Sequence, residues 1–453
     1  MVPGLAEDPV GFDAAAAAAT TATAAATSTA SANDVPQDEA VEAVARAARE
    51  HYGRLVALLA ATGVDITAAE DALADAFERA VRTWPVDGVP TKPQAWLLTV
   101  ARNRLRDRWR SAEHSRTTLL VPEAHDPAVV QEVDVDAIPD HRLALMMVCA
   151  HPAIDRTLHT PLMLTTVLGC TAAQVGRAYA VPPATMATRL VRAKRRIQAA
   201  GIPFVVPDLD SLPDRLDAVL EAVYGALAVQ WSTTGSEERE LPWEAARLAE
   251  ILVELVPAEP EARGLAALVE LDCARRPARR GAGGRFVPLA EQDTTLWDAT
   301  LIERAREHLR VAHGLGRLGR FQLEAAIQAV HCARLESGRT DWLALLGLHD
   351  ALQQVAPSLG GAVAHAAVMA EVSGPAAALD RLNQLDRESG AAAARFQPAL
   401  VLRAHLLERL DRCAEAGPVY DQAVALTHDP AERAHLERRR GGLGRWCAPS
   451  PGP

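Results

Sequence analysis

Six basic residues and no acidic residue lie between Thr171 and Ala200, in a chain of 453 residues whose net charge is −11. Arginine guanidinium groups bind DNA phosphates and pair with guanine edges, and threonine hydroxyls contact bases more weakly. The side chains of this stretch that can do so share one side of a helical repeat, together with Lys194: Thr185, Thr188, Arg189, Arg192, Arg195 and Arg196. Their types and spacing predict recognition of DNA rather than a covalent reaction.

A second basic segment lies earlier in the chain. Between Lys92 and Arg110 there are six basic residues and one acidic residue, Asp107. The two basic segments carry a charge of +11 in 49 residues, so the rest of the chain is strongly acidic. Cations concentrated in two short segments suit contact with nucleic acid at two places. The candidate contacts of the earlier segment are Arg102, Asn103, Arg104, Arg106 and Arg108.

Acidic side chains mark a third candidate surface, on a helix predicted over residues 67–84. Thr67 and Glu70 have the spacing of a capping box, and Pro85 is predicted to end the helix. The apolar positions of this helix are committed to the core, which leaves an acidic edge facing outward. The members of this edge are Asp71, Asp75 and Glu78.

Other kinds of chemistry are less well supported. Cys149 and His151, with His159 and Cys170 nearby, lack the recognisable second pair that a zinc site needs, so we expect no metal and no cofactor. The arginines that follow Asp272 and Cys273 could form an anion pocket, although a solvated helix end is the more common arrangement. No phosphate-binding glycine loop or nucleophile elbow is present. The sequence therefore predicts that the protein is not an enzyme.

Two helices are expected to position the basic residues of the 171–200 stretch. Thr171 and Gln174 form a capping box for a short first helix. Pro183 suits the first turn of a second helix, because its missing N–H costs nothing there. An apolar stripe at helical spacing gives the second helix a buried side: Met186, Leu190, Ala193 and Ile197. A short helix, a turn and a longer cationic helix form the outline of a helix-turn-helix DNA reader.

Composition favours an all-α fold. Alanine is abundant, aromatic residues make up 4% of the chain, and alternating β-branched runs are scarce. The six cysteines have no C-x-x-C pair, and we expect reduced thiols in the cytoplasm. No apolar run is long enough to cross a membrane, so no membrane partner is expected. Residues 1–35 are predicted to be a disordered Ala/Thr-rich tail and residues 113–140 a flexible linker.

Two of these motifs, in this order, resemble bacterial RNA polymerase sigma factors of the extracytoplasmic-function type. Their second domain, here residues 36–112, resembles the two segments AEDALADAFERA and PQAWLLTVARNRLRDRWRS. The helix-turn-helix of their fourth domain, here residues 141–206, resembles the segment GCTAAQVGRAYAVPPATMATRLVRAKRRIQ. The resemblance implies RNA polymerase core as a partner, through the β′ clamp and the β flap, and promoter DNA. It places the acidic edge at the clamp, the Arg102–Arg108 segment at the minus-ten element and the Thr185–Arg196 segment at the minus-thirty-five element.

The chain also resembles a subgroup with a fused tetratricopeptide-like extension and without a dedicated membrane anti-sigma factor. This resemblance is carried by the segments VCAHPAI, DCARRPAR and QDTTLWD. One departure is Gly283, which stands where the subgroup usually has an acidic residue. Successive helices are predicted from residue 212, and residues 207–446 are expected to regulate the protein in cis and to offer a surface for a protein or peptide. The alternative is an operator-binding regulator with a tetratricopeptide-like sensor that does not bind polymerase core. A weaker third reading is a scaffold whose basic helices are incidental.

Overall fold

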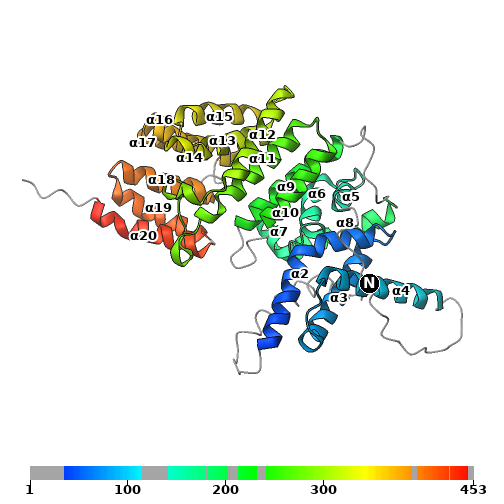
Figure 1. Ribbon diagram of the computed structural model, residues 1–453. Coiled ribbons are helices and arrows are strands. Elements are labelled where there is room, and N and C mark those ends of the chain that lie inside the picture. Colours follow the sequence, from blue (N-terminus) through cyan, green and yellow to red (C-terminus); the bar gives the residue numbers. More distant parts are fainter. Residues whose placement is uncertain are drawn as a thin grey trace, which may run out of the picture. The chain divides into compact units, whose positions relative to one another are not determined.

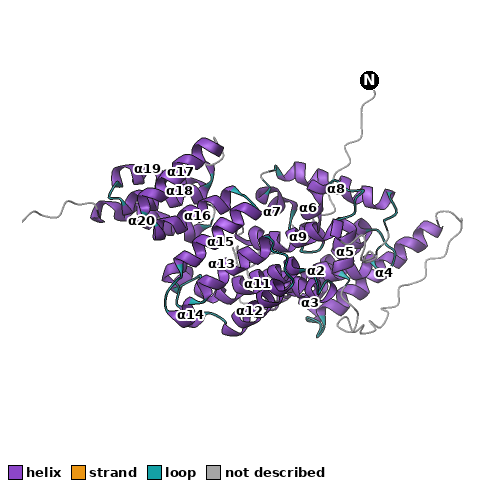
Figure 2. Ribbon diagram, turned by 90° about the horizontal axis from the view of Figure 1, so that it is seen from above, coloured by secondary structure: helices purple, strands orange, loops and turns teal. Residues whose placement is uncertain are grey.

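The computed structural model is all-α over the residues that it describes, as the composition predicted (Figure 2). The described ranges are 35–114, 141–179, 181–202, 204, 213–231, 241–389, 395–427 and 429–446. The predicted tail, except Val35, and the predicted linker from residue 115 onward lie outside them. The chain forms two compact units, Met1–Val229 and Gln230–Pro453. The domain bounds expected from the sequence stay a prediction.

The first three helices are α2 (Val35–Ala60), α3 (Ile66–Asp87) and α4 (Pro93–His114), and each packs against the other two (Figure 1). The predicted capping box at the start of α3 is wrong. Asp65 caps the helix by accepting a hydrogen bond from the Ala68 amide, and Glu70 is buried. Pro85 does not end the helix either, because α3 continues to Asp87 and Gly88 forms its C-cap.

The rest of the first unit consists of α5 (Arg142–Cys149), α6 (Arg156–Thr166), α7 (Ala172–Ala178), α8 (Pro183–Ala199) and α9 (Pro213–Trp231). Helix α2 packs on α5, and it also comes very close to the C-terminal end of α6, where Gly53 meets Val167. A Cβ atom at Gly53 would lie 1.7 Å from the Val167 carbonyl oxygen, so only glycine fits there. The two predicted sigma domains therefore contact each other within one compact unit.

Helix α11 (Pro260–Arg275) is almost entirely buried and lies at the centre of the second unit's first half. It packs against α10 (Leu241–Leu255), α12 (Ala299–Gly314) and α13 (Arg320–Cys332). Short 3-10 turns between residues 276 and 296 connect α11 to α12, with an isolated bridge between Arg280 and Phe286. The helix pattern predicted from residue 212 onward is confirmed.

Two acidic residues of the QDTTLWD segment act as helix caps. Asp293 accepts a hydrogen bond from the Thr295 amide, and Asp298 accepts two, from the amides of Thr300 and Leu301. Trp297 is buried under the guanidinium of Arg334, which lies 5.1 Å from the ring centroid. These residues fix the path of the chain into α12.

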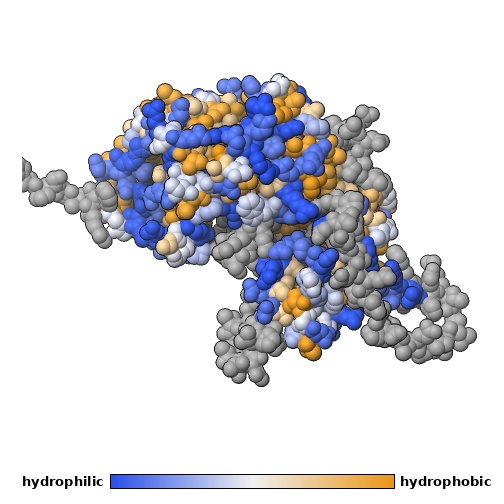
Figure 3. Space-filling model, viewed as in Figure 1, coloured by the Kyte–Doolittle hydropathy of each residue, from blue (hydrophilic) through white to orange (hydrophobic). Residues whose placement is uncertain are grey.

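Short helices make up the rest of the second unit: α14 (Arg334–Ser337), α15 (Trp342–Val355), α16 (Leu359–Val372), α17 (Pro375–Ser389), α18 (Gln397–Arg409), α19 (Cys413–Leu426) and α20 (Pro430–Trp446). From α15 onward, each helix packs against the next. One apolar cluster runs through α16 to α20 and a smaller one joins α13, α15 and α16. Figure 3 shows hydrophobic and hydrophilic side chains interleaved over the visible face of these helices.

The cysteines follow the expectation only in part. Cys149, Cys170, Cys273 and Cys332 are free and buried, but Cys413 is disulfide-bonded, which contradicts the prediction of reduced thiols throughout. Among the described helices, none combines the length and the apolar character that a membrane span requires.

Candidate nucleic-acid interface

The predicted capping box at the start of α7 is confirmed. The Thr171 hydroxyl accepts a hydrogen bond from the Gln174 amide at 3.1 Å, and the Gln174 side chain accepts one from the Thr171 amide at 2.7 Å. Gly176 allows the chain to turn back closely, because a Cβ atom there would lie 2.7 Å from the Val181 carbonyl oxygen. The turn therefore leads directly into α8, which begins at Pro183 as predicted.

Helix α8 buries the predicted stripe of Met186, Leu190, Ala193 and Ile197. All six candidate base-reading residues are exposed on the rest of the helix, and we call them the recognition face: Thr185, Thr188, Arg189, Arg192, Arg195 and Arg196. The Thr188 hydroxyl donates a hydrogen bond to the Ala184 carbonyl at 2.9 Å. Its oxygen can therefore still accept a hydrogen bond from a ligand. The recognition face therefore presents guanidinium donors and threonine hydroxyls together.

Lys194 departs from the prediction that it shares this exposed side. Its ammonium group is buried and donates hydrogen bonds to both carboxylate oxygens of Glu70 on α3, at 2.7 and 2.5 Å. The two side chains are only 8% and 7% exposed. Burial raises the pKa of the Glu70 carboxyl, and the charge of Lys194 opposes that effect. Helix α8 is thus tied to α3, the helix that carries the acidic edge.

The acidic edge and the basic helix α4, which sequence analysis treated as separate surfaces, contact each other. Arg104 donates a hydrogen bond to Asp75 at 2.5 Å, and Arg108 pairs with Asp71 at 3.5 Å. All four side chains are at least 40% exposed, so each pair contributes at most about 1 kcal/mol to stability. Glu78 is more exposed still, and its partner Arg82 lies on the same helix.

The other candidate residues of α4 also lie on its outer side. Asn103 and Arg106 are exposed, and the Arg106 guanidinium donates a hydrogen bond to the Asn103 side chain at 3.4 Å. Arg102 is half-buried, and burial together with the charge of Arg106 lowers its pKa. We call Arg102, Asn103, Arg104, Arg106 and Arg108 the basic face of α4.

A pocket that sequence analysis missed lies where α3 meets α4. Its volume is about 390 Å³, and its lining residues are Arg79, Thr83, Trp84, Asp87, Gly88, Val89, Pro90, Thr91 and Trp96. The two tryptophan rings meet edge to face, with their centroids 5.6 Å apart. The indole N–H of Trp84 is buried and has no hydrogen-bond partner. Two tryptophans on either side of a Gly/Pro loop were the available signal in the sequence.

The alternative sites considered from the sequence have structural roles. Arg275 is buried and donates to the Leu271 carbonyl and the Gln328 side chain, Arg279 pairs with Asp272, and Arg280 pairs with Asp429. Each of these three arginines is thus paired within the protein. His159 contacts the Ile154 carbonyl at 3.0 Å, and the thiols of Cys149 and Cys170 are buried, which raises the pKa of each to about 12.

Comparison with known proteins identifies two segments of the chain. Residues 47–115 match the family model Sigma-70 region 2, and residues 215–313 match a family of unknown function, DUF6596. An uncharacterized protein, R00370 of Rhizobium meliloti (strain 1021), is 36% identical over 379 residues, which cover 81% of this chain and 88% of the relative. The chain therefore contains a Sigma-70 region 2 segment. It belongs to one family with the rhizobial protein.

The region 2 segment contains the acidic edge, the basic face of α4 and the pocket beside Trp84. Helices α7 and α8 lie outside both matched segments, so the DNA-reading role of the recognition face stays a prediction. No solved structure matches the chain.

Proposed function

We propose that the protein is a sigma factor of the extracytoplasmic-function type, which binds RNA polymerase core in the cytoplasm and directs promoter-specific initiation. The observation that carries this proposal is the region 2 segment, residues 47–115, in which the acidic edge and the basic face of α4 lie side by side. An operator-binding regulator has no need of such a segment. The sigma-70 family does no covalent chemistry, which belongs to the polymerase core.

The recognition face of α8 is proposed to read the minus-thirty-five element. Exposed guanidinium groups at Arg189 and Arg192 lie one turn apart on a helix whose other side is packed. A helix with this arrangement fits the major groove, where arginine pairs bidentately with guanine. Arg195 and Arg196, further along the same helix, supply phosphate contacts.

The basic face of α4 is proposed to lie at the minus-ten element, with the neighbouring pocket as a place for an unstacked base. A base that leaves the duplex is held by aromatic side chains and by hydrogen bonds to its edge. The pocket is lined by the two tryptophans, and Arg79 and Thr83 add polar groups. Its volume of about 390 Å³ accommodates one base.

The acidic edge is proposed to bind the β′ clamp, and its pairing with α4 couples this contact to DNA. In the free protein Arg104 neutralises Asp75 and Arg108 neutralises Asp71. When these arginines turn to DNA phosphates, the two carboxylates lose their partners and become available to a basic surface on polymerase. Because the pairs are exposed, the exchange costs little.

The contact between α3 and α8 implies that the first unit must open on a promoter. Lys194 touches Glu70, and Arg104 touches Asp75 five residues further along α3, about 7.5 Å away along the helix. The recognition face and the basic face of α4 therefore lie roughly 50 Å apart at most. The two promoter elements, about 25 base pairs apart, are separated by roughly 85 Å of straight duplex. The closed unit cannot reach both at once.

The second unit is proposed to regulate these contacts in cis. Its helices α15 to α20 pack in sequence, as tetratricopeptide-like arrays do, and such stacks bind proteins or peptides. A fused regulatory region acts at high effective concentration and needs only modest affinity. It can hold the first unit closed or assist its opening.

In-vitro transcription with purified core polymerase tests the proposal. The truncation that isolates the first unit should end after Trp231, because α9 belongs to that unit and Arg215 on α9 donates a hydrogen bond to the Met147 carbonyl at 3.0 Å. We expect full-length protein to bind core and to start transcription at a specific promoter. Specific DNA binding without any association with core would instead support the operator-binding alternative.

A further inference from the structure

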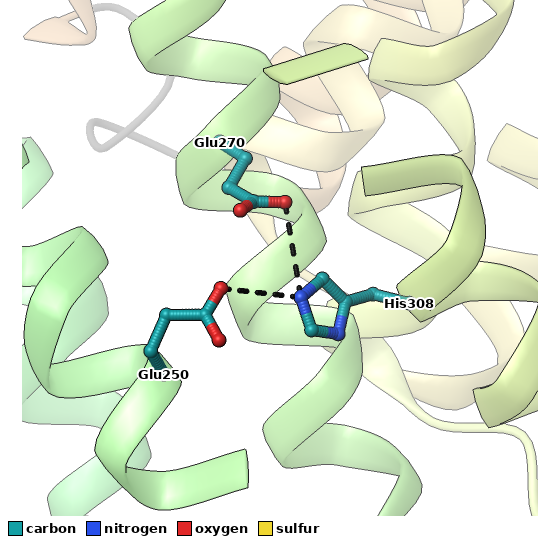
Figure 4. Close-up of side chains that lie close together, drawn as sticks. All are labelled: Glu250, Glu270 and His308. Atoms are coloured by element: carbon teal, nitrogen blue, oxygen red, sulfur yellow. Dashed lines mark hydrogen bonds and ion pairs between the residues drawn. The ribbon is translucent and has the colours of Figure 1, made fainter. Parts of the chain in front are cut away.

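Two glutamates and a histidine converge in the second unit from three different helices (Figure 4). Glu250 lies on α10, Glu270 on α11 and His308 on α12. The Nε2 atom of His308 is 3.3 Å from a Glu250 oxygen and 3.9 Å from a Glu270 oxygen. One potential ligand atom from each residue lies within 4.8 Å of the other two. All three residues fall inside the segment of unknown function, residues 215–313.

The Glu270 carboxylate is the most deeply buried member of this cluster. Its side chain is only 2% exposed, and neither of its oxygens accepts a hydrogen bond. Its ionisable neighbours are Arg304, whose guanidinium lies 2.7 Å from one oxygen, His308 and the second carboxylate, Glu250. Burial raises the pKa of Glu270, whereas the hydrogen bond with His308 lowers that of Glu250. A buried carboxylate with unfilled lone pairs is costly unless something binds it.

The Arg304 guanidinium forms ion pairs with both carboxylates, with a nitrogen 2.5 Å from a Glu250 oxygen and 2.7 Å from a Glu270 oxygen. Its side chain is 52% exposed and lies one turn before His308 on α12, so it can turn out into solvent. It would then leave two carboxylates and one imidazole facing the same point. Ligand atoms bound to one Zn²⁺ at about 2.1 Å lie roughly 3.0–4.2 Å apart, which requires only a small inward movement here.

We propose that Glu250, Glu270 and His308 form a binding site for a divalent transition-metal ion, which displaces the guanidinium of Arg304. The mixed set of one imidazole and two carboxylates suits Zn²⁺, Fe²⁺ or Mn²⁺ better than Mg²⁺, which does not favour imidazole. Because the ligands come from α10, α11 and α12, the bound ion ties these three helices together. The site is independent of the proposed sigma function, since it lies wholly in the second unit.

Zn²⁺ titration of the full-length protein against a chromogenic chelator tests the site. The protein has fourteen histidines and six cysteines, so the readout is the difference between variants. Wild type should bind one Zn²⁺ more tightly than either His308→Ala or Glu270→Gln, by at least about tenfold. The matched control is His365→Ala, which removes a histidine from an ion pair with Asp350 in the same unit and should change nothing.

Arg304→Ala separates a metal site from an internal ion-pair network. If the ion must displace the guanidinium, this variant binds Zn²⁺ more tightly than wild type, a gain that a folding defect cannot produce. The visible spectrum of the Co²⁺-loaded protein should change in His308→Ala but not in His365→Ala. Equal Zn²⁺ binding by wild type, His308→Ala and Glu270→Gln would overturn the proposal, and so would an Arg304→Ala variant that binds no more tightly.

Discussion

The buried pair of Glu70 and Lys194 makes the closed arrangement of the first unit testable. Replacing Lys194 by Met leaves a carboxylate that is 7% exposed without its partner, and such a break costs about 3–5 kcal/mol. Replacing Glu70 by Gln removes the charge on the other side. The double variant has no isolated charge, so its stability should lie close to that of wild type. The coupling energy from this double-mutant cycle should reach about 2 kcal/mol or more.

Urea unfolding of the four proteins gives the coupling energy, and the exposed pair of Asp75 and Arg104 supplies the control. That pair is 44% and 54% exposed and should couple by less than about 1 kcal/mol. Added salt should weaken the exposed pair and leave the buried pair nearly unchanged. A coupling energy for Glu70 and Lys194 no larger than that of the control would refute the closed contact.

The same cycle bears on promoter binding. Lys194 is not on the recognition face, so its loss removes no proposed DNA contact. If the unit must open to reach both promoter elements, the Lys194→Met variant, which leaves Glu70 unpaired in the closed contact, should bind a promoter duplex with both elements more tightly than wild type. Its affinity for a duplex with one element should not change.

The remaining predictions concern the other surfaces. Arg189→Ala and Arg192→Ala should each weaken promoter binding by about 1–3 kcal/mol where the arginine contacts a base, measured by fluorescence anisotropy at fixed salt; wild-type affinity in both would remove α8 from the interface. Reversal of Asp75 and Glu78 to Lys should abolish co-purification with core polymerase at unchanged helical content, whereas Asp75→Asn should keep part of it. Burial lowers the pKa of His349 to about 4 from 6.5. The unfolded chain therefore binds a proton that the folded chain does not, and this one group should lower the free energy of unfolding by roughly 1.4 kcal/mol per pH unit from pH 6.5 to 4. A His349→Gln variant that keeps the full slope in urea unfolding would contradict this.

Local patterns determined much of this protein in advance. The capping box at Thr171, the first-turn Pro183 and the apolar stripe of α8 are set by hydrogen bonds and spacing within one turn or two. The division of α8 into a buried and an exposed side follows from helical periodicity alone, and it was predicted for all but one of its basic residues. The all-α class follows from composition in the same way.

Contacts between distant helices were decided only by the tertiary structure. Lys194 is basic like its exposed arginine neighbours, but it lies four residues after Leu190 and three before Ile197, and 124 residues separate it from Glu70. Glu250, Glu270 and His308 form no sequence motif, because their spacing reflects the packing of α10, α11 and α12 rather than one helical repeat. The sequence predicts Asp71 and Asp75 as an unpaired acidic edge, whereas in the structure arginines of α4 pair with both. In each case the partner of a charge depends on which helices pack together, and periodicity within one helix carries no information about that.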